Sequence, residues 1–227
     1  MVERRYLRNL NMLSEAEMGK LAAARVAVVG CGGLGGYVLE LVGRLGVGQL
    51  TAIDGDVFDE TNLNRQLLSD LETLGQSKAE AARARMLKVN PLVNVSAIAR
   101  EVTAANGTEL LAGHDVVVDA VDSIATRLVL QALAARLGVP LVHGAIAGWY
   151  GQVTTVFPED RTLDAVYGGG SSGGIERELG NPSFTPALVA SVQAGEVLKL
   201  LIGRGEVLRK RILYIDLLEH FYTVIAI

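Results

Sequence analysis

Cysteine, histidine and proline are scarce in this chain of 227 residues, which has one cysteine, three histidines and five prolines. One cysteine cannot form a disulfide within the chain, and so low a content is typical of a reducing compartment. This excludes a small disulfide-stapled secreted domain and predicts a cytoplasmic protein. The histidines, His114, His143 and His220, lack the spacing of metal ligands, and we expect them to be structural.

Neither a strong excess of one charge nor a long apolar run is present. The formal net charge is -4 at pH 7, which gives no support for nucleic acid as the main partner. The N-terminal stretch MVERRYLRNL is charged where a signal peptide has an apolar core, and no window reaches the roughly 18 continuous apolar residues of a membrane span. No membrane association is expected, and the hydrophobic half of the residues predicts a large buried sheet.

Short apolar runs alternate with helical patterns through the first two thirds of the chain. Buried strands are predicted where β-branched and other apolar residues cluster, over 25–30, 49–54, 93–99, 115–122 and 139–145. Because helical patterns separate most of these runs, we predict an α/β fold of Rossmann-like type, a mostly parallel sheet flanked by helices.

The pattern changes after residue 144. Three further runs are expected to extend the sheet as antiparallel strands, over 150–157, 211–216 and 221–227. A long helix is predicted over 185–203, and the segment 158–183 is expected to be a loop. We predict a single domain with a helical arm and two halves, over 1–24, 25–144 and 145–227.

A glycine-rich turn, GCGGLG, directly follows the first predicted strand. Its glycines allow a tight turn and let backbone N–H groups approach a phosphate at the start of the next helix; they are Gly30, Gly32, Gly33 and Gly35. Asp54 lies about twenty residues on, where a carboxylate accepts hydrogen bonds from ribose hydroxyls. The alternative is a turn that serves only helix packing, which the position of the acid disfavours. The turn predicts a nucleotide and does not distinguish NAD from ATP.

Cations in the next segment favour a triphosphate. Arg65 lies in the stretch NLNRQ, and Lys78 opens the following helix. Hydride transfer requires no cluster of cations at the cofactor phosphates, whereas attack at a triphosphate does, because the charge of the departing pyrophosphate must be neutralised. Taken alone, Lys78 would more often be an ordinary solvated helix lysine.

Asp122 ends the fourth predicted strand, at the edge where such sheets bind ligands. A carboxylate there is suited to Mg2+ bound to phosphates. The alternative is a helix N-cap, a role for which Ser123 competes. Asp119, nearer the strand interior, is a weaker candidate.

Together these residues resemble the adenylation core of the ThiF/MoeB/HesA family, E1-like proteins related to ubiquitin-activating enzymes. The resemblance rests on GCGGLG, the DGD at 54–56, NLNRQ, Lys78 and Asp122, and it continues through GAIAGWYGQVTTVFP and YIDLLEHFY. It implies an ATP-dependent adenylyltransferase. In this family the C-terminal glycine carboxylate of a ubiquitin-fold sulfur carrier ending in Gly-Gly attacks the α-phosphate of ATP, and the products are an acyl-adenylate and pyrophosphate.

The resemblance also implies roles for single residues. Asp54 holds the ribose, and Asp122 carries Mg2+. The nucleotide-binding set that it implies is Gly30, Gly32, Gly33, Gly35, Asp54, Asp56, Asn62, Arg65, Gln66, Lys78 and Asp122. The catalytic set that it implies is Arg65, Lys78, Asp122 and Arg8. Arg8, in RYLRN, matches an arginine that reaches into the neighbouring subunit's site, which implies a homodimer; the alternative is an exposed basic N-terminus.

Two departures from the family are visible. Many relatives carry paired Cys-x-x-Cys motifs for structural zinc, and this chain has none, so zinc is not expected. Some carry a cysteine in the crossover loop that bonds to the partner. Here the crossover loop, over 158–183 in the partner-binding half, has glycine and serine over 168–174 instead. Cys31 is expected to be a small core residue, so the acyl-adenylate would pass to an external sulfur donor.

Three other functions stay open from the sequence. An E1-like enzyme that activates a small carboxylate on modified tRNA is one, because DAVDS has some similarity to that branch, although the acidic balance argues against RNA. An NAD-dependent oxidoreductase is permitted by the glycine turn alone. A non-catalytic E1-like binding subunit is the third, and the intact Arg65, Lys78 and Asp122 argue against it. The sequence does not indicate whether a carrier would serve thiamine, molybdenum or tungsten cofactor, or cysteine synthesis.

Overall fold

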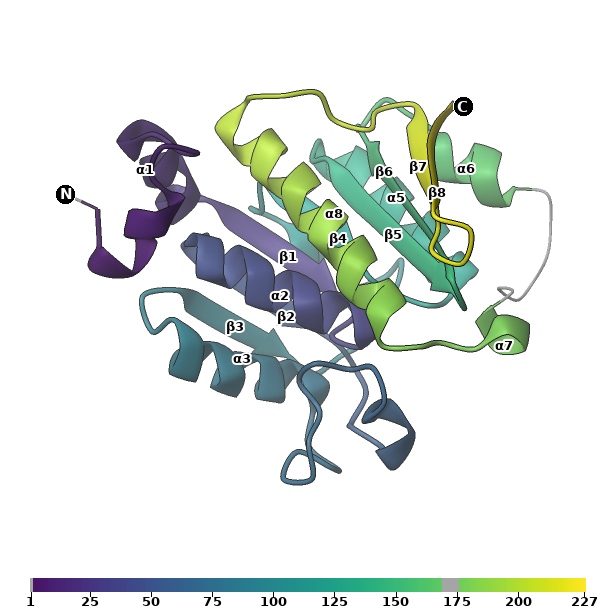
Figure 1. The fold of residues 1–227 in the computed structure, drawn as a ribbon, viewed down its shortest axis with the longest axis horizontal. Coiled ribbons are helices and arrows are strands. Elements are labelled where there is room, and N and C mark those ends of the chain that lie inside the picture. Colours follow the sequence, from purple (N-terminus) through teal and green to yellow (C-terminus); the bar gives the residue numbers. More distant parts are fainter. Residues whose placement is uncertain (1, 169–175) are drawn as a thin grey trace.

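One eight-stranded sheet runs through the molecule (Figure 1). The computed structural model describes residues 2–168 and 176–227. The strand order is β3-β2-β1-β4-β5-β6-β7-β8. Five strands are mutually parallel: β1 (Arg25–Val29), β2 (Gln49–Ile53), β3 (Asn94–Ile98), β4 (Val116–Asp119) and β5 (Leu141–Ala147). Three are antiparallel to their neighbours: β6 (Tyr150–Val156), β7 (Arg211–Asp216) and β8 (Phe221–Ala226). The predicted fold class is confirmed.

Helices cover both faces of the sheet (Figure 1). Those whose buried residues join one core are α1 (Glu15–Ala23), α2 (Gly33–Leu45), α3 (Lys78–Val89) and α8 (Phe184–Ile202). Those of the second core are α4 (Gly107–Leu111), α5 (Ile124–Leu137) and α6 (Thr162–Tyr167). Successive residues of β1 alternate between the two cores, since Val26 and Val28 belong to the first and Ala27 and Val29 to the second. This is why the strands read as continuous apolar runs.

The chain changes direction next to β1. It passes from β1 to β2 and β3 on one side of β1, and then returns to β4 on the other side. The connections that leave the carboxyl ends of β1 and β4 therefore run to opposite faces of the sheet, and a crevice opens between them. The turn at Gly30 and the turn at Asp122 border this crevice.

α8 is the longest helix of the described residues and packs against α2 and β5. By length and composition alone it could cross a membrane, because an 18-residue window has a mean hydropathy of 1.3. Half of that window is buried inside the structure, and a core helix passes the same test. Its buried residues include Gln193 and Glu196, which hydrogen-bond to the sheet or the segment before β7.

The segment 158–183, expected to be a loop, contains two short helices, α6 and α7 (Glu176–Leu179). α6 has only six residues, too few to form without tertiary contacts. It is held by Leu163, which is fully buried and whose N–H donates to Gln131 Oε1 of α5 at 2.7 Å. Most of the predicted glycine and serine cluster, over 169–174, lies outside the described residues.

Candidate active site

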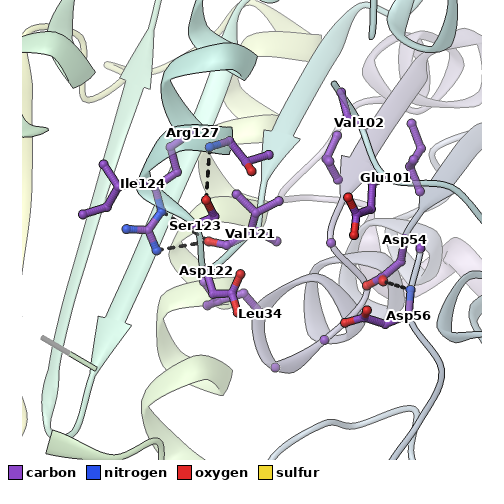
Figure 2. Close-up of a pocket in the computed structure, with 18 of the residues that line it drawn as sticks. Leu34, Asp54, Asp56, Glu101, Val102, Val121, Asp122, Ser123, Ile124 and Arg127 are labelled. Atoms are coloured by element: carbon purple, nitrogen blue, oxygen red, sulfur yellow. Dashed lines mark hydrogen bonds between the residues drawn. The ribbon is translucent and has the colours of Figure 1, made fainter. Parts of the chain in front are cut away.

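A cleft of about 1050 Å³ opens at the carboxyl ends of β1, β2 and β4. It is lined by the turn after β1, the loop after β2, the start of α3, the turn between β4 and α5, and the end of α6. Figure 2 shows the Asp122 carboxylate on one side of the cleft and the carboxylates of Asp54 and Glu101 on the other. Pockets for small molecules hold roughly 300–1,000 Å³, so the cleft has room for a nucleotide.

The glycines of the turn have two different roles, close backbone packing and exposure of the backbone to the cleft. Gly30 has a φ of 89°, and a Cβ there would lie 2.6 Å from the carbonyl oxygen of Ala120; a Cβ on Gly35 would lie 1.7 Å from the carbonyl oxygen of Gly30. These two are required by backbone packing alone. Gly32 and Gly33 line the cleft, and a Cβ on Gly33 would meet nothing closer than 3.7 Å. Their missing side chains leave the backbone open to a ligand.

α2 begins at the cleft without a side-chain cap. α1, α3 and α5 start at serines whose hydroxyls accept a first-turn N–H, whereas the N-cap of α2 is Gly32, which offers no side-chain acceptor. The N–H groups of the first helical turn have no partner within the helix, and the helix dipole adds positive charge at this end. The start of this 13-residue helix is therefore suited to an anion.

Asp54 ties the turn after β1 to the end of β2. Its Oδ2 accepts the Cys31 N–H at 2.7 Å, and its Oδ1 accepts the Asp56 N–H at 2.8 Å. Each carboxylate oxygen has a second lone pair, so both can accept from a ligand hydroxyl as well. The two backbone bonds hold the carboxylate at the edge of the cleft.

Lys78 is held in the cleft wall and is not a solvated helix lysine. Only 7% of the residue is exposed, and its ammonium nitrogen lies 2.9 Å from Asp56 Oδ2. Its backbone N–H also donates to the Asp56 carbonyl oxygen at 3.0 Å. This ion pair uses one of the three N–H donors of the Lys78 ammonium group, and Lys78 also lines the cleft.

Only part of the NLNRQ stretch lines the cleft. Arg65 and Gln66 line it; the Arg65 guanidinium donates to the Thr61 carbonyl and to Asn64 Oδ1, and among the described residues Gln66 Oε1 is buried without a hydrogen-bond partner. Asn62 does not line it. The Oδ1 of Asn62 accepts the Asp59 N–H at 3.1 Å and closes the short 3-10 helix Glu60–Asn62.

Asp122 is exposed and lines the cleft, and the N-cap role belongs to its neighbour, since Ser123 Oγ accepts the Thr126 N–H. Asp119, the weaker candidate, is fully buried and bonded to His143. Over residues 2–168 and 176–227, no group of three or more His, Cys, Asp or Glu side chains is placed to hold a metal ion. A cation at Asp122 would therefore need ligand oxygens such as phosphates, which is how Mg2+ is commonly held.

Arg8 is exposed and far from the cleft of its own chain. It lies in the 3-10 helix Arg4–Asn9, where the neighbouring Tyr6 ring contacts the C-cap of α2 at Gly46. The cleft is at the other end of α2, and a helix of 13 residues is about 20 Å long. Within one chain, the structure does not bring Arg8 to the other predicted site residues.

Cys31 is fully buried, as expected, and does not line the cleft. Burial, and then the nearby negative charge of Asp54, raise the pKa of its thiol well above the usual value. A thiol in that state is a poor nucleophile.

Several cleft residues were not predicted from the sequence, chiefly Arg127, Tyr167 and Glu101. Arg127 had a signal, because it lies one helical turn after the cap Ser123, on the side of α5 that faces the cap. Tyr167 had none, because it ends a helix that forms only through contacts with α5.

One family model matches the chain, and many known proteins resemble it. The ThiF family model matches residues 6–227. The "SAMP-activating enzyme E1" of Haloferax volcanii is 35% identical over 226 residues, which cover 97% of this chain and 84% of that protein. The "Sulfur carrier protein adenylyltransferase" of Thermus thermophilus is 35% identical over 224 residues, 92% of this chain and 80% of that protein.

A solved structure, that of the E. coli tRNA N6-threonylcarbamoyladenosine dehydratase TcdA in complex with ATP, has a TM-score of 0.75 and 25% identity, and the match covers 88% of this chain and 94% of that one. Because the family model spans all but the first few residues and the two relatives match over most of their own length, the chain belongs to the ThiF family.

Proposed function

We propose that this protein is an ATP-dependent adenylyltransferase that activates the C-terminal glycine of a small ubiquitin-like sulfur-carrier protein as an acyl-adenylate. The observation that carries the proposal is one cleft that is lined by the uncapped start of α2, by the cations Lys78 and Arg65, and by the Asp122 carboxylate. The names of the relatives, an adenylyltransferase and an activating enzyme, support a nucleotidyltransferase and favour a carrier protein as its substrate.

The residues of the cleft fit a nucleoside triphosphate. When bound, ATP supplies the phosphorus that the carboxylate attacks and the pyrophosphate that leaves. Lys78, Arg65 and the first-turn N–H groups of α2 neutralise the phosphates, and Asp54 accepts from the ribose hydroxyls. The buried Gln66 Oε1 has an acceptor to offer to a ligand donor.

Two further parts of the proposal concern charge and assembly. Asp122 would hold Mg2+ together with phosphate oxygens, since its carboxylate is free of the N-cap role. Arg8 would complete the site of a second copy in a homodimer, because it lies at the far end of α2 from its own cleft.

The tRNA-linked carboxylate is the second candidate, and the similarity to TcdA favours it. The net charge of -4 makes an RNA partner less favourable than a protein carrier. An NAD-dependent oxidoreductase would need no lysine and arginine at the phosphates, so Lys78 and Arg65 argue against it.

Exchange of radiolabelled pyrophosphate into ATP tests the proposal. The protein is incubated with ATP, Mg2+ and candidate carriers that end in Gly-Gly, and the matched control is each carrier without its last two residues. We expect exchange that requires the intact carrier. Exchange that proceeds with a threonylcarbamoyl-adenosine tRNA and with no carrier would favour the second candidate.

A further inference from the structure

A closed ring of hydrogen bonds passes through Val121, the residue that precedes Asp122. The ring consists of Val121, Asp119, His143, Tyr167 and Arg127. From the Val121 N–H it runs to Asp119 Oδ1 at 3.1 Å, and from Asp119 Oδ2 to His143 Nδ1 at 2.7 Å. From His143 Nε2 it runs to the Tyr167 hydroxyl at 2.9 Å.

The ring returns to Val121 through Arg127. Arg127 Nη1 donates to the Tyr167 hydroxyl at 3.3 Å, and its Nη2 and Nε donate to the Val121 carbonyl oxygen at 3.0 and 3.2 Å. Both polar groups of the Val121 residue are thus held, the N–H from one side and the carbonyl from the other, and both paths meet at the Tyr167 hydroxyl.

Three members of the ring are buried, Val121 and Tyr167 are partly buried, and the ring joins four elements. Asp119 of β4 and His143 of β5 are paired in the sheet and are 0% and 1% exposed, and Arg127 of α5 is 5% exposed. Tyr167 is the last residue of α6 and lines the cleft. Asp119, the Val121 turn and Arg127 lie within one short stretch of chain, whereas Tyr167 reaches them only through the fold.

The direction of each bond follows from a count of donors and acceptors. The Tyr167 oxygen accepts from Arg127 Nη1 and from Gln152 Nε2, the latter at 2.5 Å, and these donors fill its two lone pairs. Its own proton is then donated to His143 Nε2, so His143 is neutral and its Nδ1 proton is donated to Asp119. Burial agrees with this, since it lowers the pKa of His143.

The same count of donors and acceptors excludes a direct hydrogen bond from the Tyr167 hydroxyl to a substrate. With both lone pairs and its proton engaged, its hydroxyl has nothing left to offer a substrate. What it can do is hold the two paths of the ring together and thereby fix the Val121 peptide, which carries Asp122 into the cleft.

We propose that Tyr167 and His143 are positioning residues for adenylation, which through the closed ring hold the Val121 peptide so that the Asp122 carboxylate faces the bound triphosphate. This rests on the proposed function for the reaction itself. A network that only stabilised the fold would contribute to the melting temperature and leave the chemistry of the folded protein unchanged.

Two substitutions that each remove hydrogen bonds of the Tyr167 hydroxyl distinguish a positioning role from a purely stabilising one. Tyr167→Phe keeps the aromatic ring and removes the hydroxyl, which opens the hydrogen-bond ring at two bonds. Gln152→Leu removes the third bond to the same hydroxyl, and Gln152 is neither a member of the ring nor a lining residue of the cleft. We expect kcat for pyrophosphate exchange to fall roughly ten- to a hundredfold in Tyr167→Phe, since small displacements of a positioned group have effects of that size. The KM for ATP should change little, and Gln152→Leu should match the wild type.

A binding measurement tests the ring without turnover. The rise in melting temperature with ATP is measured with Mg2+ and with a chelator, and the difference reports the contribution of the cation. We expect this difference to shrink in Tyr167→Phe and to persist in Gln152→Leu. If both variants keep the wild-type kcat and the wild-type difference, the ring does not position Asp122 and the inference is wrong.

A second pair of variants covers the case in which Tyr167→Phe does not fold. His143→Gln offers one amide donor and one amide acceptor in place of the two ring nitrogens, whereas His143→Leu offers neither. We expect His143→Gln to retain more of the kcat than His143→Leu. It should also retain more of the cation difference, which is the difference between the ATP-induced rises in melting temperature with Mg2+ and with a chelator. Equal values in the two variants would overturn the inference. If the wild type shows no exchange with any carrier, the proposed function fails, and the cation difference still tests the ring.

Discussion

Lys78 is the first residue of α3, and its ammonium group is held beside the Asp56 carboxylate at the wall of the cleft. Arg65 approaches the same space from the loop after β2. At the scale of residues, these two side chains favour a triphosphate site over a dinucleotide site, because the proposed reaction needs positive charge beside a leaving pyrophosphate.

Lys78→Ala and Arg65→Ala should each lower carrier-dependent pyrophosphate exchange by about a hundred- to a thousandfold, as loss of one transition-state charge contact does. Lys88→Ala is the control, since Lys88 is an exposed lysine in the last turn of the same helix. Exchange is measured after circular dichroism has shown that each variant is folded. Near-normal exchange in the Lys78 and Arg65 variants would contradict their assigned roles.

Cys31 gives a second prediction at this scale. Its thiol is fully buried with a raised pKa, so we expect it not to act as a nucleophile towards the proposed acyl-adenylate. Cys31→Ala should keep most of the exchange activity, and no thiol-sensitive adduct with the carrier should appear on a non-reducing gel. An adduct that disappears with dithiothreitol and in Cys31→Ala would identify Cys31 as a nucleophile.

At the scale of elements, the start of α2 must both pack closely against the preceding turn and leave open space in the cleft. Gly35 must lack a side chain because the helix begins against the Gly30 carbonyl, while Gly33 faces the open cleft. One helix turn therefore contains a glycine that the fold requires and, in the proposed function, a glycine that the nucleotide requires.

Substituting each of these two glycines by alanine should separate the demands. Gly35→Ala should destabilise the protein by about 3 kcal/mol or more, because its Cβ would overlap the Gly30 carbonyl oxygen. Gly33→Ala should change the free energy of unfolding by less than about 1 kcal/mol and weaken ATP binding about tenfold or more, near 1.4 kcal/mol. Urea unfolding and ATP titration measure the two effects. The assignment is wrong if Gly33→Ala binds ATP as the wild type does.

His143 links two strands and a helix, and its protonation should couple to stability. It faces Asp119 of β4, Arg127 of α5 and Tyr167 of α6; burial lowers its pKa below the usual 6.5, Arg127 acts in the same direction, and Asp119 opposes them. As the pH falls below about 6.5, the unfolded chain therefore takes up this proton before the folded chain does.

The free energy of unfolding should therefore decrease as the pH is lowered from 7 through 6.5 toward the depressed pKa of His143. His143→Gln has no proton to gain and should lack this part of the decrease. Urea unfolding at several pH values compares the two proteins. Identical pH dependence would show that His143 does not carry the effect.

At the scale of the whole molecule, Arg8 and the cleft lie at opposite ends of α2. One chain alone does not place Arg8 near Lys78. If both belong to the same site, that site is built from two copies, as proposed.

Mixing Arg8→Ala protein with Lys78→Ala protein should then restore part of the exchange activity that each has lost. In a mixed dimer the two substitutions fall in the same site, so the other site has both residues intact. The measurement is exchange after subunit mixing, with each variant alone as the control. If subunits exchange and activity does not recover, Arg8 is not part of the partner's site.

The sequence by itself determined the fold class and the place of the glycine turn and of Asp54 at the cleft. Both depend on patterns within a few dozen residues of chain: β-branched runs that alternate with helices, a glycine turn directly after a strand, and Asp54 at the end of the next strand. These patterns can be recognised in short segments of sequence. Their consequence for the site does not depend on the details of packing, because parallel strands bring their carboxyl ends to one edge of the sheet.

The tertiary structure decided which polar side chains reach the cleft. It placed Asn62 in a 3-10 turn outside the cleft lining, although Asn62 lies within three residues of Arg65. It also buried Lys78, where the residue taken alone would more often be a solvated helix lysine. It also formed α6 and brought Tyr167 to His143 and Arg127. These outcomes depend on hydrogen bonds and packing between residues tens of positions apart, which no local pattern of hydrophobicity or turn residues encodes.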